Sequence, residues 1–268
     1  WFIRRPLIHL NTDGIYISPR KSGTGWELHI DTEIQNEDSS DATYTLQHTI
    51  SDKDNNEIYS LRMTGICTPG LNIKKQTITV ADAVLWDIDE PYLYSLRTEL
   101  VTDKYAGDYD RQAFGFRTIE FTPDKGLYLN GRNITINGSC EHHTLGALGA
   151  AINRTALRRQ LESLQRMGVN AVRSAHNMPS AELLELCDEM GILLYTESFD
   201  MWEHCKTDYD YGNYFKEWWK KDVTSWVRQD RNHPCVFIWG IGNEIHDINY
   251  ERGLAVTRML RDAVRELD

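Results

Sequence analysis

Two different patterns of hydrophobic and polar positions divide the chain near residue 122. From about His9 to Phe121, short segments of alternating or β-branched residues are separated by clusters of turn-forming residues. Alternation with a period of two is typical of strands that bury one face. The segments lie at residues 14–17, 25–35, 42–51, 57–64, 72–80, 94–102 and 113–121. Seven short strands predict a β-sandwich, and an immunoglobulin-like architecture is the expected form.

After Pro123, strand-like segments alternate with helix-like segments. The predicted strands lie at residues 133–137, 169–174, 192–196 and 236–241, and the predicted helices at 154–167, 181–190, 214–229 and 250–267. Four consecutive βα units predict a parallel sheet, either open or part of a (β/α)8 TIM barrel. No glycine-rich phosphate-binding motif follows any of these strands, which disfavours a nucleotide-binding open sheet.

Composition and charge narrow the possible partners. The 268 residues are 41% hydrophobic, enough for a packed core, and carry a formal net charge of −11. Because no basic cluster is present, neither nucleic acid nor a membrane surface is an expected partner. The five cysteines are scattered and never spaced as CxxC, which argues against a disulfide framework and a zinc knuckle. The chain begins at Trp1 without an initiator methionine, so we expect it to be cut from a longer protein, and its localisation stays open.

Polar residues gather just past the predicted strand ends of the second half. They are Glu141, His142, His143, His176, Asn177, Glu197, Asp200, Asn243 and Glu244. In a barrel of parallel strands, all of these positions would converge on one rim, where barrel enzymes build their active sites.

Glu244 is the leading candidate for an acid/base. It follows the apolar run Val236–Ile241, and a carboxyl group partly desolvated there can deliver a proton near neutral pH. The structural alternative is a glutamate that caps or salt-bridges the following helix. The preceding Asn243 favours the catalytic reading, since an amide on the same rim can bind a substrate hydroxyl.

Other side chains could border or organise this site. His142 and His143 should point to opposite sides, so at most one of them faces it. Arg173 lies inside a predicted strand, where it could organise rim carboxylates or act structurally. Trp202, in a loop after a strand, is the aromatic candidate for stacking on a sugar ring. The spacing of the histidines does not match a barrel hydrolase metal site, so we expect neither a metal nor another cofactor.

The residues resemble glycoside hydrolase family 2, the family of β-galactosidases, β-glucuronidases and β-mannosidases. Asp230–Glu244 is similar throughout to the acid/base signature of that family, and Asn170–His176 resembles its other signature on the second barrel strand. Leu85–Tyr94 and Phe114–Glu120 look like the end of its immunoglobulin-like domain. Leu127–Gly131 looks like the entry to its barrel.

The resemblance implies a retaining glycosidase acting on β-linked sugars. Glu244 would be the general acid/base, Asn243 would bind the 2-hydroxyl, His142 and His176 would border the sugar, and Arg173 would support the carboxylates. The family nucleophile is a glutamate on the seventh barrel strand. Since the chain ends after the fourth, we expect no nucleophile in it and little or no activity of the fragment alone.

The expected organisation is therefore a multidomain fragment. Residues 1–8 would be the tail of a jelly-roll sugar-binding domain, residues 9–121 the immunoglobulin-like sandwich, and residues 122–268 the first half of the TIM barrel. An exposed half barrel would also favour self-association. A β-galactosidase is the expected parent, while β-glucuronidase, β-mannosidase and a non-catalytic carbohydrate-binding relative remain alternatives.

Overall fold

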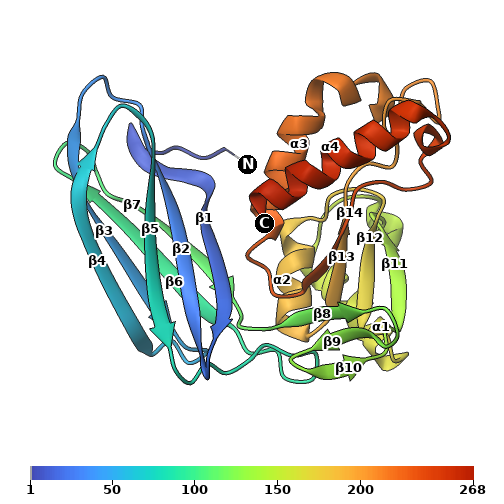
Figure 1. Ribbon diagram of the computed structural model, residues 1–268, viewed down its shortest axis with the longest axis horizontal. Coiled ribbons are helices and arrows are strands. Elements are labelled where there is room, and N and C mark those ends of the chain that lie inside the picture. The colour runs from blue at the N-terminus through green and yellow to red at the C-terminus, as the bar shows by residue number, and fades with distance from the viewer. Residues whose placement is uncertain (1) are drawn as a thin grey trace. The chain divides into compact units, whose positions relative to one another are not determined.

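The computed structural model describes residues 2–268, so Trp1, the first residue of the predicted jelly-roll tail, lies outside the described residues. The chain divides into two compact units. One comprises residues up to Trp86 together with Tyr92–Arg117, and the other comprises Asp87–Pro91 and Thr118–Asp268. Figure 1 shows the first unit as strands and the second as helices packed on strands.

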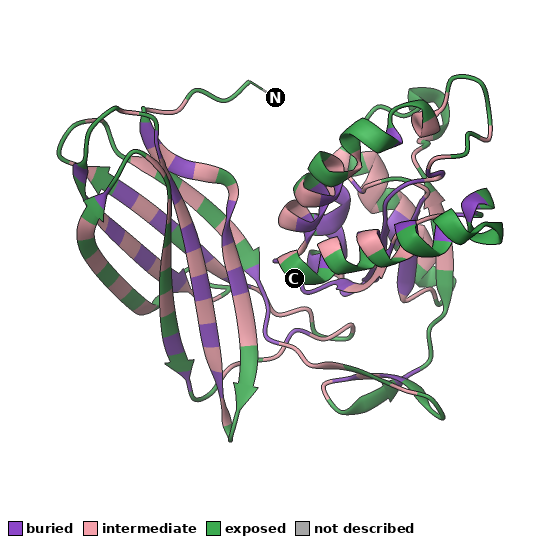
Figure 2. Cartoon of the chain, turned by 45° about the horizontal axis from the view of Figure 1, so that its top comes forward, coloured by how far each residue is buried: buried purple, intermediate pink, exposed green. Residues whose placement is uncertain are grey.

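The first unit is a sandwich of two antiparallel sheets, as predicted. One sheet has the order β1 (Ile8–Ser22), β2 (Gly25–Asn36), β5 (Gly70–Val80), and the other has the order β4 (Glu57–Cys67), β3 (Ala42–Ser51), β6 (Tyr94–Thr102), β7 (Asp108–Phe114). Along β2, buried residues alternate strictly with partly exposed ones, and Figure 2 shows alternating burial along strands of the first unit. The inward residues, among them Leu28, Ile30 and Leu46, form one hydrophobic core.

The strand predicted over residues 113–121 is wrong, because the chain leaves the sheet in the middle of it. β7 ends at Phe114, and the next strand, β8 (Ile119–Thr122), belongs to the second unit. Between them, the ring of Phe116 packs edge-on against Trp26 and Tyr94, with centroids 5.4 and 5.2 Å apart. This inward packing ends the strand, so the first unit stops at Arg117, before the predicted boundary at residue 121.

A small antiparallel sheet opens the second unit and corrects a second prediction. It has the order β10 (Arg132–Ile134), β9 (Gly126–Leu129), β8, and its hairpin turns at Asn130 and Gly131, whose φ angles are 54° and 80°. Asn-Gly is the sequence that a two-residue hairpin with two positive φ angles favours. The strand predicted over residues 133–137 is therefore the return of a hairpin, and the first parallel strand is β11 (Gly138–His142).

The rest of the second unit is a four-stranded parallel sheet with helices. The order is β11, β12 (Ala171–Ala175), β13 (Leu193–Glu197), β14 (Val236–Gly240). The helices are α1 (Arg154–Arg166), α2 (Ala181–Met190), α3 (Phe215–Asp230) and α4 (Glu251–Leu267), with short 3-10 turns η1 (Gly146–Leu148), η2 (Tyr211–Asn213) and η3 (His246–Asn249). All four predicted helices are confirmed within one or two residues. In the described part of the chain, no helix has the length and apolar character needed to cross a membrane.

Local sequence explains where these helices begin and end. The side chains of Asn153 and Ser180 accept hydrogen bonds from backbone N–H groups in the first turns of α1 and α2. Gly191 ends α2 in the left-handed conformation, with φ at 68°.

A buried polar network fixes α3 to the sheet. The Thr196 hydroxyl donates to Asp230 and accepts a hydrogen bond from the Trp226 indole at 2.7 Å. Burial raises the pKa of Asp230 to about 7, although the Thr196 hydrogen bond acts in the opposite direction. Asp230, the first residue of the Asp230–Glu244 signature, therefore anchors the helix to the sheet.

Candidate active site

The carboxyl ends of the parallel strands bring three predicted side chains together around Arg173. The Arg173 guanidinium, on β12, donates to the Glu197 carboxylate at 2.6 Å and to the Asn243 side-chain oxygen at 2.9 Å. These residues are far apart in sequence but lie at the ends of neighbouring strands. Arg173 therefore contacts two rim residues, and its role in organising them stays a prediction.

Glu197 is the buried anchor of the cluster. Its side chain is 0% exposed, and its second oxygen lies 3.1 Å from Nδ1 of His176. The His176 ring in turn lies edge-on to the His142 ring, with centroids 5.1 Å apart. The two predicted sugar-bordering histidines are therefore neighbours, and Glu197 holds one of them.

The surroundings of Arg173 keep it charged. Burial opposes the charge, but the Glu197 carboxylate more than compensates and raises the pKa of Arg173 above its ordinary value. The Cys140 sulfur lies 3.7 Å from the guanidinium, which also sits over the Tyr195 ring at 5.5 Å. These residues share one face of the sheet because they occupy paired positions on β11, β12 and β13.

Asn243 is held by the protein at both ends of its amide. While its oxygen accepts from Arg173, its Nδ2 donates to Asp200 at 2.9 Å, and its backbone N–H donates to Phe199 at 3.2 Å. Burial opposes the charge on Asp200, but hydrogen bonds from Lys206 and Asn243 hold the pKa of Asp200 below its ordinary value. The Asn243 side chain is therefore fixed in one orientation by protein contacts alone.

Glu244 differs from its neighbours in being free. It is exposed, so the expected partial burial of its carboxyl group is not observed. Among residues 2–268 its carboxylate makes no hydrogen bond or ion pair, which removes the capping alternative. Its φ is 44°, a left-handed conformation that costs an L residue roughly 1–2 kcal/mol. A free carboxylate on a strained residue at a strand end is typical of a functional position.

Trp202 is not where the sequence predicted it. The side chain is 2% exposed, packs with Phe199 and Phe215, and donates its indole N–H to the Ile241 carbonyl at 2.7 Å. A ring buried in this way has no free face for a sugar, so the prediction of stacking by Trp202 is corrected. Trp202 belongs to a hydrophobic cluster that also contains Phe199, Phe215 and Ile245.

The aromatic side chains in the first turns of α3 differ in exposure. Phe215 is fully buried and Trp219 packs against the same core, whereas Trp218 is 41% exposed.

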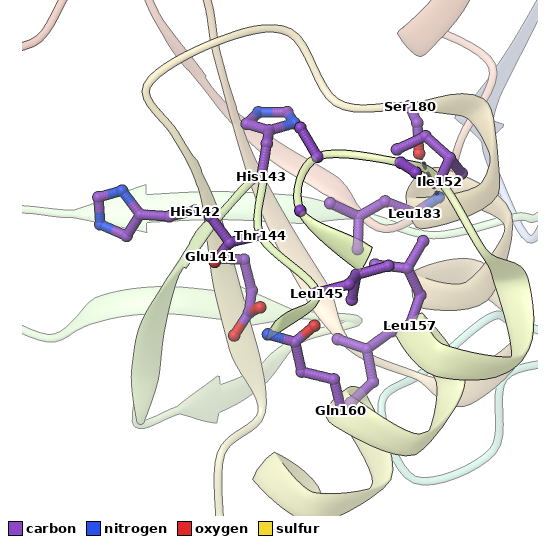
Figure 3. Close-up of a pocket in the computed structure, with 14 residues that line it drawn as sticks. Glu141, His142, His143, Thr144, Leu145, Ile152, Leu157, Gln160, Ser180 and Leu183 are labelled. Carbon is purple, nitrogen blue, oxygen red and sulfur yellow. Dashed lines mark hydrogen bonds between the residues drawn. The ribbon is translucent and has the colours of Figure 1, made fainter. Parts of the chain in front are cut away.

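The Glu141–His143 segment divides between two environments. Glu141 lines a pocket together with residues of α1 and α2, and burial raises the pKa of its carboxyl group. Figure 3 shows the Glu141 carboxylate directed toward Gln160, while His142 and His143 extend in different directions. Only His142 of the three contacts the Arg173 cluster, through His176.

Lys206 and Asp200 join the site in ways that sequence reasoning missed. Asp200 was noted past a strand end without a role, and Lys206 was not noted. The available signal was a lysine in a loop that is otherwise acidic and aromatic. Over the described residues, no group of three or more His, Cys, Asp or Glu side chains is arranged to hold a metal ion.

Comparisons with known proteins give a consistent result. Residues 8–117 match the family model "Glycosyl hydrolases family 2", and residues 121–268 match "Glycosyl hydrolases family 2, TIM barrel domain". The chain is 39% identical over 247 residues to beta-galactosidase BoGH2A of Bacteroides ovatus, covering 91% of this chain and 29% of that protein. It is 42% identical over 163 residues to a putative beta-glucuronidase of Formosa agariphila, covering 60% of this chain and 16% of that protein.

Solved structures agree. A glycosyl hydrolase family 2 member from Bacteroides cellulosilyticus superposes with a TM-score of 0.92 at 34% identity, covering 97% of this chain and 34% of that one. A beta-glucuronidase from Bacteroides uniformis superposes with a TM-score of 0.84 at 27% identity, covering 98% of this chain and 34% of that one. The chain spans about a third of the length of these two structures and of the beta-galactosidase, and 16% of the putative beta-glucuronidase.

Proposed function

Because the chain belongs to glycoside hydrolase family 2, we propose that the protein containing it is a retaining β-glycosidase with Glu244 as its general acid/base. The observation that carries this proposal is the contrast at the end of β14. Asn243 is fixed by Arg173 and Asp200, whereas the Glu244 carboxylate beside it is exposed and unpaired. A proton donor must be free to reach the departing oxygen, while a residue that binds the sugar must be held still.

In the proposed mechanism, Glu244 protonates the glycosidic oxygen and later removes a proton from the attacking water. A second carboxylate, about 5–5.5 Å away in retaining enzymes, attacks the anomeric carbon. Glu197 does not suit that role, because it is fully buried and bound by Arg173 and His176. We therefore place the nucleophile outside these 268 residues, with the four βα units forming the first half of a (β/α)8 barrel behind an immunoglobulin-like domain.

We propose a β-galactoside as the substrate, since the relative matched over 91% of this chain is named a beta-galactosidase. A β-glucuronide is the second candidate, since other relatives carry that name. His142 and His176 would border the sugar, with Asn243 on its 2-hydroxyl. Rates of the full-length protein on an aryl β-galactoside and an aryl β-glucuronide, measured side by side, distinguish the two.

The decisive variant is Glu244→Gln in the full-length protein. General acid/base catalysis contributes about 10²–10⁴-fold, so we expect kcat to fall within that range. Glu162→Gln, an exposed glutamate on α1, is the matched control and should keep wild-type activity. Full activity of Glu244→Gln would refute the assignment.

The chain alone should not turn over substrate, because we place the nucleophile elsewhere. Hydrolysis by the purified 268-residue chain that disappears on Glu244→Gln would contradict this proposal. Self-association is also proposed, since β11 and β14 are the two edges of the parallel sheet. Sedimentation of the isolated chain as a monomer across a wide concentration range would argue against it.

A further inference from the structure

The loops after β13 and β14 are tied together by Lys206. Its ammonium group donates to Asp200 Oδ1 at 2.7 Å and to the backbone carbonyl of Asn243 at 2.9 Å. The side chain is 19% exposed, so both bonds are shielded from most of the solvent. An ammonium group with three donors can hold two fixed acceptors from different loops at once.

The carbonyl that Lys206 binds belongs to the peptide that joins Asn243 to Glu244. Rotation of this peptide changes φ of Glu244, which stands at 44°. A non-glycine residue stays in that region only if its surroundings hold it there. Since the Glu244 side chain makes no hydrogen bond or ion pair within residues 2–268, its direction depends on this backbone.

Each group of Asn243 has a separate partner in this arrangement. Arg173 and Asp200 bind the two ends of the side-chain amide, and Phe199 accepts the backbone N–H. Lys206 binds the remaining group, the carbonyl oxygen. Without Lys206, the carbonyl of the peptide that leads to Glu244 would lose its partner, and Asp200 would lose its ion pair. Arg173 and Asp200 could still bind the two ends of the Asn243 amide.

We propose that Lys206 is a positioning residue, which fixes the Asn243–Glu244 peptide and so aims the Glu244 carboxyl group at the leaving-group oxygen. This inference rests on the proposed function. A purely structural salt bridge between Lys206 and Asp200 is the competing explanation. The two explanations predict different results for a Lys206 variant. A positioning role would impair proton donation more than sugar binding, whereas a purely structural salt bridge would not distinguish them.

The test uses Lys206→Met in the full-length protein and two aryl glycosides of one sugar. A phenyl leaving group needs a proton, whereas a dinitrophenyl leaving group departs without one. A small misplacement of a catalytic group costs up to about 10²-fold. We expect kcat/KM to fall about 10–100-fold on the phenyl glycoside and less than about 3-fold on the dinitrophenyl glycoside. Lys220→Met, an exposed lysine on α3, is the control and should change neither value.

Hydrogen exchange of the peptide covering residues 241–249 gives a readout that does not need activity. Lys206→Met should speed exchange there, and Lys220→Met should not. If the wild-type protein cleaves no glycoside but exchange still quickens, the contact stands and the proposed enzymatic function fails. Unchanged exchange, or equal losses on both glycosides, would overturn the positioning role.

Lys206→Arg provides a second variant should the methionine variant not fold. Arginine keeps the charge, but its planar guanidinium cannot reproduce the two bonds of a compact ammonium group. We expect a smaller loss with the same dependence on the leaving group. A loss that is equal for both leaving groups in this variant would also overturn the inference.

Discussion

Replacing Arg173 with methionine should destabilise the second unit more than any surface charge change. The substitution leaves the fully buried Glu197 carboxylate without its guanidinium partner and removes the donor to the Asn243 oxygen. His176 remains beside Glu197, but its Nδ1 contact at 3.1 Å is longer than the lost 2.6 Å bond. A buried carboxylate that loses its counter-ion pays a desolvation cost without compensation.

The size of the effect follows from burial. Removing one partner of a buried ion pair typically costs about 3–5 kcal/mol. Because the Arg173 side chain is 25% exposed and water can partly replace it, we expect about 3 kcal/mol. For a unit of about 150 residues, 1 kcal/mol shifts the melting temperature by about 2–4 °C, so Tm should fall by about 6–12 °C.

Urea unfolding followed by helical circular dichroism measures this change, since α1–α4 all lie in the second unit. Arg261→Met is the matched control, because its pair with Asp262 is exposed on both sides and should be worth at most about 1 kcal/mol. The double variant Arg173→Met/Glu197→Gln should recover part of the loss, because the uncompensated charge is gone.

One contrary result would be an Arg173→Met variant that loses no more free energy of unfolding than Arg261→Met. A second contrary result would be a double variant that loses the sum of the stability losses of Arg173→Met and Glu197→Gln measured separately. Either result would mean that the Glu197 carboxylate does not depend on the guanidinium.

Two further predictions concern the scaffold. Burial raises the pKa of Asp230 to about 7. Between about pH 4 and 7, the folded state therefore keeps a proton on Asp230 that the unfolded chain has lost. The contribution of this group to the free energy of unfolding falls as pH rises through that window. In the Asp230→Asn variant, the midpoint of urea unfolding should depend less on pH over this range. An unchanged dependence on pH would contradict the burial argument. Gly191→Ala should lower the free energy of unfolding by at least about 1 kcal/mol more than Gly168→Ala. Both glycines have a positive φ, but only a Cβ on Gly191 would meet a backbone oxygen, that of Ile88 at 2.3 Å. Equal thermal shifts of the two alanine variants would remove the steric argument.

Features that depend on local pattern could be predicted from the sequence. The four helices followed from the helix-like segments of the second half, and the structure shows local caps at Asn153, Ser180 and Gly191. The approach of Arg173 to the Asn243 position also followed, because parallel strands end at one edge. Helix ends are encoded by neighbouring residues, which is why a single sequence reveals them.

Features that depend on distant partners could not be predicted in this way. Trp202 was expected to be exposed because it lies in a loop, but its indole N–H meets Ile241, which follows another strand. The contacts of Lys206 could not be predicted for the same reason, because its two acceptors lie on different loops. The hairpin at Asn130 and Gly131 was different, because its turn signal was present in the sequence but read as a barrel entry.

Thr196 and Glu197 are consecutive residues of β13 that serve opposite faces of the sheet. Thr196 binds Trp226 and Asp230 of α3, while Glu197 binds Arg173 and His176. A single peptide, about 3.3 Å of strand, therefore separates the helix layer from the rim. Under the proposed function, a substitution at Trp226 or Asp230 that displaces Thr196 should also displace Glu197 and so change the rate of glycoside hydrolysis.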